Sequence, residues 1–559
     1  MTSRHLEFWP KHVPHNIEIP DTSLWFNVEV SAARYPSKPC INFYDSILTF
    51  ADFRREAEQL AGYLQTACGV RRGDRVALYL QNSPQFVLGY YAILRADAMV
   101  VPINPMNLTK EVGHIVTDSG ATTLICAQDQ LSRVEPLLGH GVSNLIVACY
   151  SDYLKSPSEI EIPAWLSAPR QPLATPSPGI ALWSDALASG ASPRPHLATS
   201  SDLCVMPYTS GTTGLPKGCV HRHRSVMFTT VTLPEWYRTN QGEVVMAVLP
   251  FFHVTGMQNS MNTPIYGAST IVLLPRWDRK IAAEMIKRYR VTSLSMVPTM
   301  VVDLLSSPDV ASFDLSSIHS LGGGGAAMPE AIAHKLKEMC GIEFNEGYGL
   351  SETIAPTHIN PPARPKRQCL GIPLFNTEAR VVNPDTMAEV PAGEVGEIIV
   401  SGPQVFDGYW NNPQANAACF VELDGKRFFR TGDLARTDDD GYYFLVDRLK
   451  RMINVGGFKV WPAEVEAVLY SHPAILEAVI ISRKDPRRGE SVKAVVVLKP
   501  AARGTVDEAQ LAQWAKENMA AYKVPSSFEF AEALPKTATG KIQWRVLQEK
   551  EQEAERARG

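Results

Sequence analysis

One stretch of the sequence concentrates groups that bind phosphate. Residues 208–218 read Tyr-Thr-Ser-Gly-Thr-Thr-Gly-Leu-Pro-Lys-Gly and follow a predicted strand at 203–206. The glycines let backbone N–H groups close around a polyanion, the hydroxyls add donors, and Lys217 adds positive charge. The spacing is not that of a P-loop, because no Gly-Lys-Ser/Thr follows four residues after a glycine. We therefore predict a phosphate-binding loop of another type, formed by Thr209, Ser210, Gly211, Thr212, Thr213, Gly214 and Lys217.

Further segments place aromatic, acidic and basic residues beside glycines. Each segment alone is typical of an ordinary loop or helix start. It is their order along the chain that indicates a shared function. They are 249–253 (Leu-Pro-Phe-Phe-His), 347–353 (Gly-Tyr-Gly-Leu-Ser-Glu-Thr), 431–433 (Thr-Gly-Asp), 447–450 (Asp-Arg-Leu-Lys) and 535–541 (Pro-Lys-Thr-Ala-Thr-Gly-Lys).

Taken in order, these segments closely resemble the motifs of the adenylate-forming superfamily, which comprises acyl-CoA synthetases, the adenylation domains of peptide synthetases, and luciferases. The resemblance covers nearly the whole chain and is greatest to bacterial fatty acyl-CoA ligases. It implies an ATP-dependent acid–thiol ligase that forms acyl-AMP and pyrophosphate, and then acyl-CoA and AMP. The implied cofactors are ATP, Mg²⁺ and coenzyme A, and the remaining partner is a small-molecule carboxylic acid.

The resemblance implies catalytic roles for three residues. Negative charge builds on the phosphoryl oxygens when a carboxylate attacks the α-phosphorus of ATP, so cations and donors must surround that phosphate. The family's lysine, here Lys541, neutralises this charge, and the family's glutamate, here Glu352, holds Mg²⁺ against the phosphates. His253 corresponds to a histidine between the acyl pocket and the CoA tunnel, where it acts as a gate and positioning group.

Nucleotide contacts follow from the same resemblance. Tyr348 would stack on adenine, Asp433 would accept hydrogen bonds from the ribose hydroxyls, and Arg448 would reach the ribose or the phosphate. The implied cofactor-binding residues beyond the loop are Gly323, Gly324, Gly325, Tyr348, Gly349, Ser351, Asp433 and Arg448, with Gly456, Gly457 and Phe458 on the pantetheine channel of CoA.

The predicted acyl pocket is lined by apolar or small residues and has no cation that would bind a second carboxylate. This favours a medium- or long-chain fatty acid, with an aryl or alicyclic acid as the alternative. Residues 254–259 lack the acid with which peptide-synthetase domains pair their substrate's amino group, but transfer to a carrier protein stays an alternative. The roles of Asn454 and Lys459, which depart from many aryl ligases, stay open. The predicted pocket residues are Val254, Met257, Val297, Pro298, Gly322 and Leu350.

Strand and helix patterns alternate along most of the chain. A strand at 75–80, a helix from Ser83 to Arg95 capped by Ser83-Pro84, and a strand at 99–103 predict a βαβ unit with a parallel sheet. We predict an α/β fold, with a large N-terminal domain of βαβ-type sheets at 1–449. A small mobile α+β domain at 450–559 carries the lysine, and Lys450 is the hinge.

Composition narrows the class of protein. A net charge of -4 gives no sign of nucleic-acid binding, and the basic run 221–224 is predicted to be solvated surface. Nine cysteines without a Cys-x-x-Cys pair indicate reduced thiols in the cytoplasm. No apolar run reaches the length of a membrane span. We predict a frayed, solvated helix end at 549–559, and the sequence leaves monomer and homodimer open.

Overall fold

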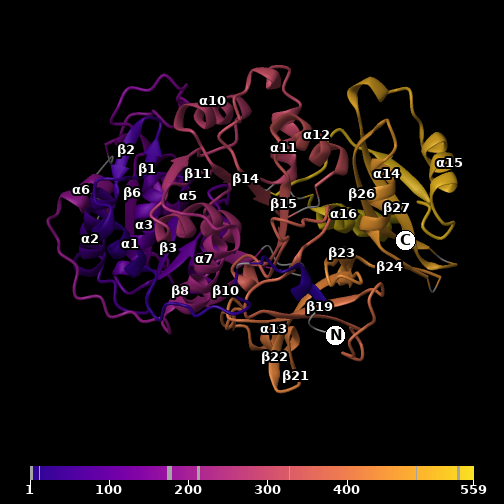
Figure 1. Ribbon diagram of the computed structural model, residues 1–559, viewed down its shortest axis with the longest axis horizontal. Coiled ribbons are helices and arrows are strands. Elements are labelled where there is room, and N and C mark those ends of the chain that lie inside the picture. The colour runs from indigo at the N-terminus through magenta and orange to yellow at the C-terminus, as the bar shows by residue number, and fades with distance from the viewer. Residues whose placement is uncertain are drawn as a thin grey trace. The chain divides into compact units, whose positions relative to one another are not determined.

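The computed structural model describes residues 4–11, 13–172, 179–209, 215–325, 328–456, 458–485, 487–537 and 542–558 (Figure 1). The chain divides into two compact units. The larger unit comprises His5–Glu378 and Ser401–Arg427, and the smaller comprises Met1–Arg4, Ala379–Val400 and Phe428–Gly559. The predicted α/β class with a large and a small part is confirmed, and the predicted boundary at 449/450 lies inside the smaller unit.

The first sheet of the larger unit has the order β20-β10-β8-β4-β3-β5-β6-β7, with β9 paired to β10. Strands β8 to β7 in this order are parallel, and β10 pairs antiparallel with β8, β9 and β20. The strands are β3 (Arg75–Tyr79), β4 (Met99–Pro102), β5 (Thr123–Ala127), β6 (Asn144–Ala148), β7 (Ile180–Leu182), β8 (Leu203–Val205), β9 (Tyr208–Thr209), β10 (Lys217–Arg222) and β20 (Gly408–Tyr409).

The second sheet has the order β17-β16-β15-β14-β13-β11-β12-β1-β2, and β15 to β1 in this order are parallel. The strands are β1 (Pro39–Phe43), β2 (Ser46–Thr49), β11 (Val244–Ala247), β12 (Thr270–Leu273), β13 (Ser293–Ser295), β14 (Ser320–Gly323), β15 (Phe344–Tyr348), β16 (His358–Ile359) and β17 (Ile372–Pro373). Strand β14 includes the first two glycines of the run 322–325.

The α-helices of the larger unit connect and cover these strands. They are α1 (Trp25–Arg34), α2 (Phe50–Thr66), α3 (Pro84–Arg95), α4 (Thr109–Ser119), α5 (Leu131–Val134), α6 (Trp183–Ala188), α7 (His223–Tyr237), α8 (Val254–Met257), α9 (Thr263–Tyr266), α10 (Arg279–Tyr289), α11 (Pro298–Leu305), α12 (Glu330–Cys340) and α13 (Pro413–Cys419), which leads into β21 (Phe420–Leu423).

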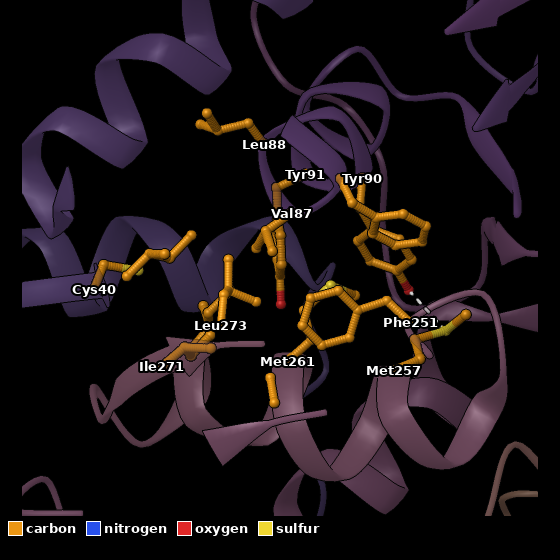
Figure 2. Close-up of a cluster of buried hydrophobic side chains, with 14 of the residues drawn as sticks. Cys40, Val87, Leu88, Tyr90, Tyr91, Phe251, Met257, Met261, Ile271 and Leu273 are labelled. Atoms are coloured by element: carbon orange, nitrogen blue, oxygen red, sulfur yellow. Dashed lines mark hydrogen bonds between the residues drawn. The ribbon is translucent and has the colours of Figure 1, made fainter. Parts of the chain in front are cut away.

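Helix α3 forms the centre of the main core, because every one of its residues is buried. Its start is the predicted one: the Ser83 hydroxyl accepts a hydrogen bond from the Phe86 N–H at 3.1 Å, and Pro84 follows as the first helical residue. In Figure 2, Val87 and Tyr90 of α3 face Phe251, Met257 and Met261. A helix apolar all round is expected only in such an interior position.

The smaller unit contains two sheets. In the first, β19 pairs with β22 and β22 with β23; in the second, the order is β25-β24-β27-β26, with β28 parallel to β27. Helices and strands are mixed along this part of the chain, as the predicted α+β character of 450–559 requires. The elements are β18 (Glu378–Val382), β19 (Gly396–Ser401), β22 (Lys426–Thr437), β23 (Tyr443–Arg448), β24 (Ile453–Val455), β25 (Phe458–Val460), α14 (Pro462–Tyr470), β26 (Ile475–Asp485), β27 (Gly489–Leu498), α15 (Glu508–Asn518), β28 (Ser527–Phe530) and α16 (Trp544–Arg558).

Helix α16 departs from the predicted solvated end at 549–559 at one residue, because Glu551 is buried while Glu549, Lys550, Gln552 and Glu553 are exposed as predicted. The Glu551 side chain is only 5% exposed, and its carboxylate lies 2.5 Å from the Lys493 ammonium on β27. The Gln548 amide accepts from the Ser482 N–H and donates to the Ser482 carbonyl, both at 2.8 Å. Side chains of α16 therefore bind β26 and β27. The number of charged residues in the segment does not predict these contacts.

The basic run 221–224 corrects a second prediction, because His221 and His223 are buried rather than solvated. The His223 Nδ1 accepts a hydrogen bond from the Leu24 N–H at 3.1 Å. Burial lowers the pKa of His221 to about 4 and that of His223 to about 3. Both imidazoles are therefore neutral in the folded larger unit near pH 7.

We predict that these two buried histidines make the folded chain less stable in mild acid. Each has a folded pKa below the ordinary value of 6.5, so the unfolded chain binds more protons and stability falls as pH drops from about 6.5 toward 4. We expect each histidine to contribute a loss of about 2 kcal/mol between pH 7 and pH 5. Urea unfolding at both pH values measures it. His223→Gln should be less stable at pH 7 but lose less on acidification, and an unchanged pH dependence would contradict this account.

Candidate active site

Strand β10 brings the predicted phosphate-binding lysine close to the predicted metal-binding glutamate. Lys217 opens β10, and Tyr409 of β20 pairs with Cys219 of the same strand. The Tyr409 hydroxyl donates to the Glu352 Oε1 at 2.7 Å, and the Lys217 ammonium lies 4.9 Å from the centroid of the Tyr409 ring. Burial, followed by the charge of Glu352, raises the pKa of Tyr409. Tyr409 was not predicted, because its contact depends on a strand pairing that joins distant segments.

The backbone around Glu352 is held from both sides. Ser351–Thr353 form a single 3-10 turn, at whose start the Leu350 N–H donates to the Thr353 hydroxyl at 2.9 Å. The His221 Nε2 lies 2.7 Å from the Ser351 carbonyl oxygen and donates to it, since a carbonyl only accepts. The Phe406 N–H donates to the Glu352 carbonyl at 2.9 Å. The predicted pair Ser351 and Glu352 therefore lies on a fixed turn.

The predicted glycines lie where strands approach closely. Gly323 of β14 pairs with Glu346 of β15, and a Cβ on Gly323 would lie 1.9 Å from the Met296 carbonyl oxygen. A Cβ on Gly324 would lie 2.4 Å from the Gly347 carbonyl oxygen. Both contacts are shorter than any real Cβ tolerates, so packing within the chain already requires these glycines. Tyr348 ends β15, with its ring edge-on to His358 at 5.7 Å between centroids.

The predicted acyl-pocket residues come from four neighbouring elements. His253 caps α8, which continues through a π-helix at 258–262 into α9, and Val254 and Met257 belong to this helix. Gly322 lies on β14, between β13 and β15. Val297 and Pro298 follow β13, and Leu350 follows β15. The carboxyl ends of parallel strands share one edge of a sheet, which is where α/β folds bind ligands.

Met257 also belongs to the hydrophobic core. It is fully buried, and its sulfur lies 3.7 Å from the Tyr90 hydroxyl of α3. Figure 2 shows it among Phe251, Met261 and Tyr90. Further along the same helical segment, Asn259 donates to the Ser295 hydroxyl of β13 at 3.2 Å, so this segment makes polar as well as apolar contacts.

In the smaller unit, the predicted ribose-binding residues are neighbours. Asp433 of β22 pairs with Arg448 of β23, and the Arg448 Nε lies 2.9 Å from the Asp433 Oδ1. The turn before Asp433 is fixed by Glu397, whose carboxylate lies 2.5 Å from the Arg430 guanidinium and accepts from the Gly432 N–H at 3.1 Å. Glu397 was not predicted, because it belongs to none of the motif segments.

The predicted hinge residue Lys450 lies in a 3-10 turn at Leu449–Arg451. The neighbouring Arg451 side chain is 12% exposed and forms ion pairs with Asp447, at 3.6 Å, and with Glu466. Burial raises the pKa of both carboxyl groups. Gly456, with φ of 60°, forms the turn between β24 and β25, and the exposed Phe458 ring stacks on Tyr522 at 4.9 Å between centroids.

Thr209 is the last residue of β9 and pairs with Lys217 of β10. Gly325 lies two residues after β14, and Gly349 follows β15 directly. The remaining predicted residues, Ser210, Gly211, Thr212, Thr213, Gly214, Gly457 and Lys541, lie outside the described residues. On either side of the 538–541 segment, Lys536 and Ile542 form an antiparallel bridge, and the Gln543 N–H donates to the Pro535 carbonyl at 2.7 Å.

Two sequence profiles match this chain. The profile of the AMP-binding enzyme family matches residues 28–410, and that of the AMP-binding enzyme C-terminal domain matches residues 464–541. The chain belongs to the AMP-binding enzyme family. The predicted resemblance to adenylate-forming, fatty acyl-CoA ligase-like enzymes is thereby confirmed.

Curated relatives of known activity span nearly the whole chain. A long-chain-fatty-acid–CoA ligase of Bacillus subtilis is 36% identical over 98% of this chain and 97% of its own. A feruloyl-CoA synthase of Amycolatopsis is 34% identical over 91% of this chain and 94% of its own. These relatives support the assignment as an AMP-forming acid–thiol ligase that uses ATP, Mg²⁺ and CoA.

Solved structures of this family share the fold. The ATP-bound MatB of Rhodopseudomonas palustris is 27% identical, with a TM-score of 0.83 over 95% of this chain and 99% of that one. The anthranilate CoA ligase AuaEII in complex with anthranoyl-AMP has the same identity and TM-score, over 96% and 98% of the two chains. In the described parts of this chain, no helix is both long and apolar enough to cross a membrane.

The Glu352 region fits a magnesium ion bound together with ATP. Mg²⁺ is usually held by one or two carboxylates, with phosphate oxygens and waters as its other ligands. Glu352 supplies one carboxylate on a fixed turn, next in sequence to Ser351. The described residues contain no group of three or more His, Cys, Asp or Glu side chains that could hold a metal by itself, so phosphate oxygens and water would supply the other ligands. Bound there, Mg²⁺ would neutralise phosphate charge.

We predict that Glu397 stabilises the turn that carries Asp433. Glu397→Ala removes the carboxylate partner of the Arg430 guanidinium, whose side chain is 29% exposed and keeps, among the described residues, only the Pro384 carbonyl as an acceptor, and it removes the acceptor of the Gly432 N–H. Loss of one partner of such a pair should lower the free energy of unfolding of the smaller unit by about 3 kcal/mol. Chemical denaturation measures the change. Glu394→Ala, at an exposed position nearby, is the control, and equal stabilities of the two variants would refute this role.

Proposed function

We propose that this acid–CoA ligase acts on a medium- or long-chain fatty acid in the cytoplasm. The observation that carries the proposal is the apolar character of Val254, Met257 and Val297 at the carboxyl edge of the second sheet. A fatty acyl chain needs an apolar surface and a single polar end, where its carboxylate meets the nucleotide. The near full-length similarity to a long-chain-fatty-acid–CoA ligase supports the same acid.

A second candidate acid is an aryl acid, and one polar contact favours it. Asn259 donates to Ser295 of β13, while its own Oδ1 is buried and has no hydrogen-bond partner among the described residues. A buried acceptor without a partner costs free energy that a ligand hydroxyl would recover. The similarity to a feruloyl-CoA synthase agrees with this alternative.

In the proposed adenylation step, a carboxylate oxygen of the acid forms a bond to the α-phosphorus of ATP, and the bond to pyrophosphate breaks. Lys217 and Lys541 place positive charge against the phosphate oxygens as negative charge builds there. Glu352 orients the metal-bound nucleotide, and Asp433 accepts from the ribose hydroxyls. Binding both reactants in this arrangement replaces a collision between two anions with an oriented attack.

In the proposed second step, the CoA sulfur forms a bond to the acyl carbonyl carbon, and AMP leaves with the electrons of the broken C–O bond. This step needs access for a thiol rather than neutralisation of phosphate. The exposed Phe458 and the turn at Gly456 suit a pantetheine arm, which is narrow and partly apolar. We propose that movement at Lys450 exchanges the lysine of the first step for this channel.

We predict that AMP forms in turnover only when ATP, Mg²⁺, a suitable acid and CoA are all present. A panel of short-, medium- and long-chain acids and aryl acids, assayed for AMP release, should give the highest kcat/KM with a fatty acid of at least medium length. If an aryl acid is fastest, the second candidate replaces the first. If no acid yields AMP or a bound adenylate, the proposed function is wrong.

We also predict that Lys541→Ala lowers the rate of adenylation at least a hundredfold, since it removes a cation that acts in the transition state. Thioester formation from supplied acyl-AMP should fall far less. Lys550→Ala removes an exposed lysine of α16 and serves as the charge-matched control. Equal activity of Lys541→Ala and Lys550→Ala would exclude the assigned role.

A further inference from the structure

We propose that Tyr409 is a positioning residue that orients the Glu352 carboxylate for the magnesium–nucleotide complex and holds Lys217 beside it. The proposal rests on the proposed role of Glu352 as the ligand of the metal bound with ATP. It adds a residue from β20 to a site otherwise assembled from the motif segments.

The contact between Tyr409 and Glu352 is short and directional. The phenol donates to the Glu352 Oε1 at 2.7 Å, the usual length for a hydroxyl bound to a carboxylate. A bond to one oxygen sets the rotation of the carboxylate plane, so the group is oriented before a metal arrives.

Tyr409 is itself fixed through its backbone. Its N–H donates to the Asn416 Oδ1 at 2.6 Å, and the Asn416 Nδ2 donates back to the Tyr409 carbonyl at 3.0 Å. Tyr409 also pairs with Cys219 of β10, and the Phe406 ring packs edge-on against its ring at 4.9 Å between centroids. A side chain supported on all these sides has little freedom to release the carboxylate.

The same ring faces the lysine of the phosphate-binding segment. The Lys217 ammonium lies 4.9 Å from the ring centroid, within the range of a cation–π contact. The ring thus takes a cation on its face and an anion at its hydroxyl. Lys217 and Glu352 thereby contact the same rigid side chain. In this arrangement, both can act on the phosphates of a single ATP.

Groups that orient a metal ligand act on metal affinity rather than on nucleotide affinity. Replacing such an outer partner commonly lowers metal affinity 10- to 100-fold. Tyr409→Phe removes only the hydroxyl and keeps the ring that contacts Lys217. The hydroxyl's effect on Glu352 is thereby separated from the ring's effect on Lys217.

The experiment measures Mn²⁺ binding to the full chain in the presence of ATP, from the electron paramagnetic resonance signal of free Mn²⁺. We expect Tyr409→Phe to weaken Mn²⁺ binding at least tenfold. ATP binding with EDTA present, measured by calorimetry, should change less than twofold. Raising the Mg²⁺ concentration should restore most of the adenylation rate of this variant.

The matched control is Tyr289→Phe, which also removes a tyrosine–carboxylate hydrogen bond in the larger unit, to Asp45 at 3.0 Å. It should leave Mn²⁺ binding unchanged. In a double-mutant cycle with Glu352→Gln, the effect of Tyr409→Phe should vanish, because the charged ligand that it orients is gone. If Tyr409→Phe does not fold, Asn416→Ala, which frees the backbone of β20, should weaken Mn²⁺ binding at least threefold.

Wild-type affinity for Mn²⁺ in Tyr409→Phe would overturn the proposal, as would an equal loss of ATP binding with and without metal. If the wild-type chain forms acyl-AMP while Tyr409→Phe binds Mn²⁺ normally, only the role of Tyr409 fails. If the wild-type chain with ATP binds no Mn²⁺, the assigned role of Glu352 fails together with that of Tyr409.

Discussion

The antiparallel pairing of β10 is the constraint on which the site of the larger unit depends. One edge of β10 meets β8 and joins the parallel sheet, while β20 pairs along the other edge. Through this strand, Lys217 reaches the face of Tyr409 and His221 reaches the turn at Ser351. Residues that lie far apart in the sequence therefore share one rigid support, which holds Lys217 and Glu352 against the same tyrosine side chain.

Burial of polar groups makes this support specific. His221 is neutral, and its Nε2 donates to the Ser351 carbonyl. Glu397, almost fully buried, satisfies both a guanidinium and a backbone N–H. A buried polar group tolerates few alternative partners, because each unmade hydrogen bond costs free energy. Such groups stabilise one arrangement of their turn at the expense of others, as an active site requires.

The sequence predicted the fold class, and it predicted the elements whose signals are local. The helix at Ser83–Arg95 was readable because its cap and its proline lie in its own first turn. The motifs likewise predict Glu352 and Asp433 as site residues, on the resemblance to the family. Tyr409 and Glu397 were not predicted, because their contacts depend on the pairing of strands that are distant in sequence.

The wrong predictions share a physical cause. The basic run 221–224 and the charged end at 549–559 are predicted to be solvated because charge usually faces water, and the exceptions are His221, His223 and Glu551. In both segments the fold supplies partners instead: the Leu24 N–H for His223, and the Lys493 ammonium for Glu551. A charged or titratable residue is buried when such a partner is available, and the residue's own neighbours in sequence do not reveal one.

The order in which the chain visits its two units limits how this enzyme could be recombined with its relatives. The chain leaves the larger unit after Glu378, returns for Ser401–Arg427, and then leaves again. The returning segment carries β20, so a crossover at 378 or at 400 would take Tyr409 from one parent and Glu352 from another. A crossover after Arg427 keeps both with their own neighbours. A chimera therefore keeps the contact between Tyr409 and Glu352 from one parent only when residues 379–400 also come from that parent.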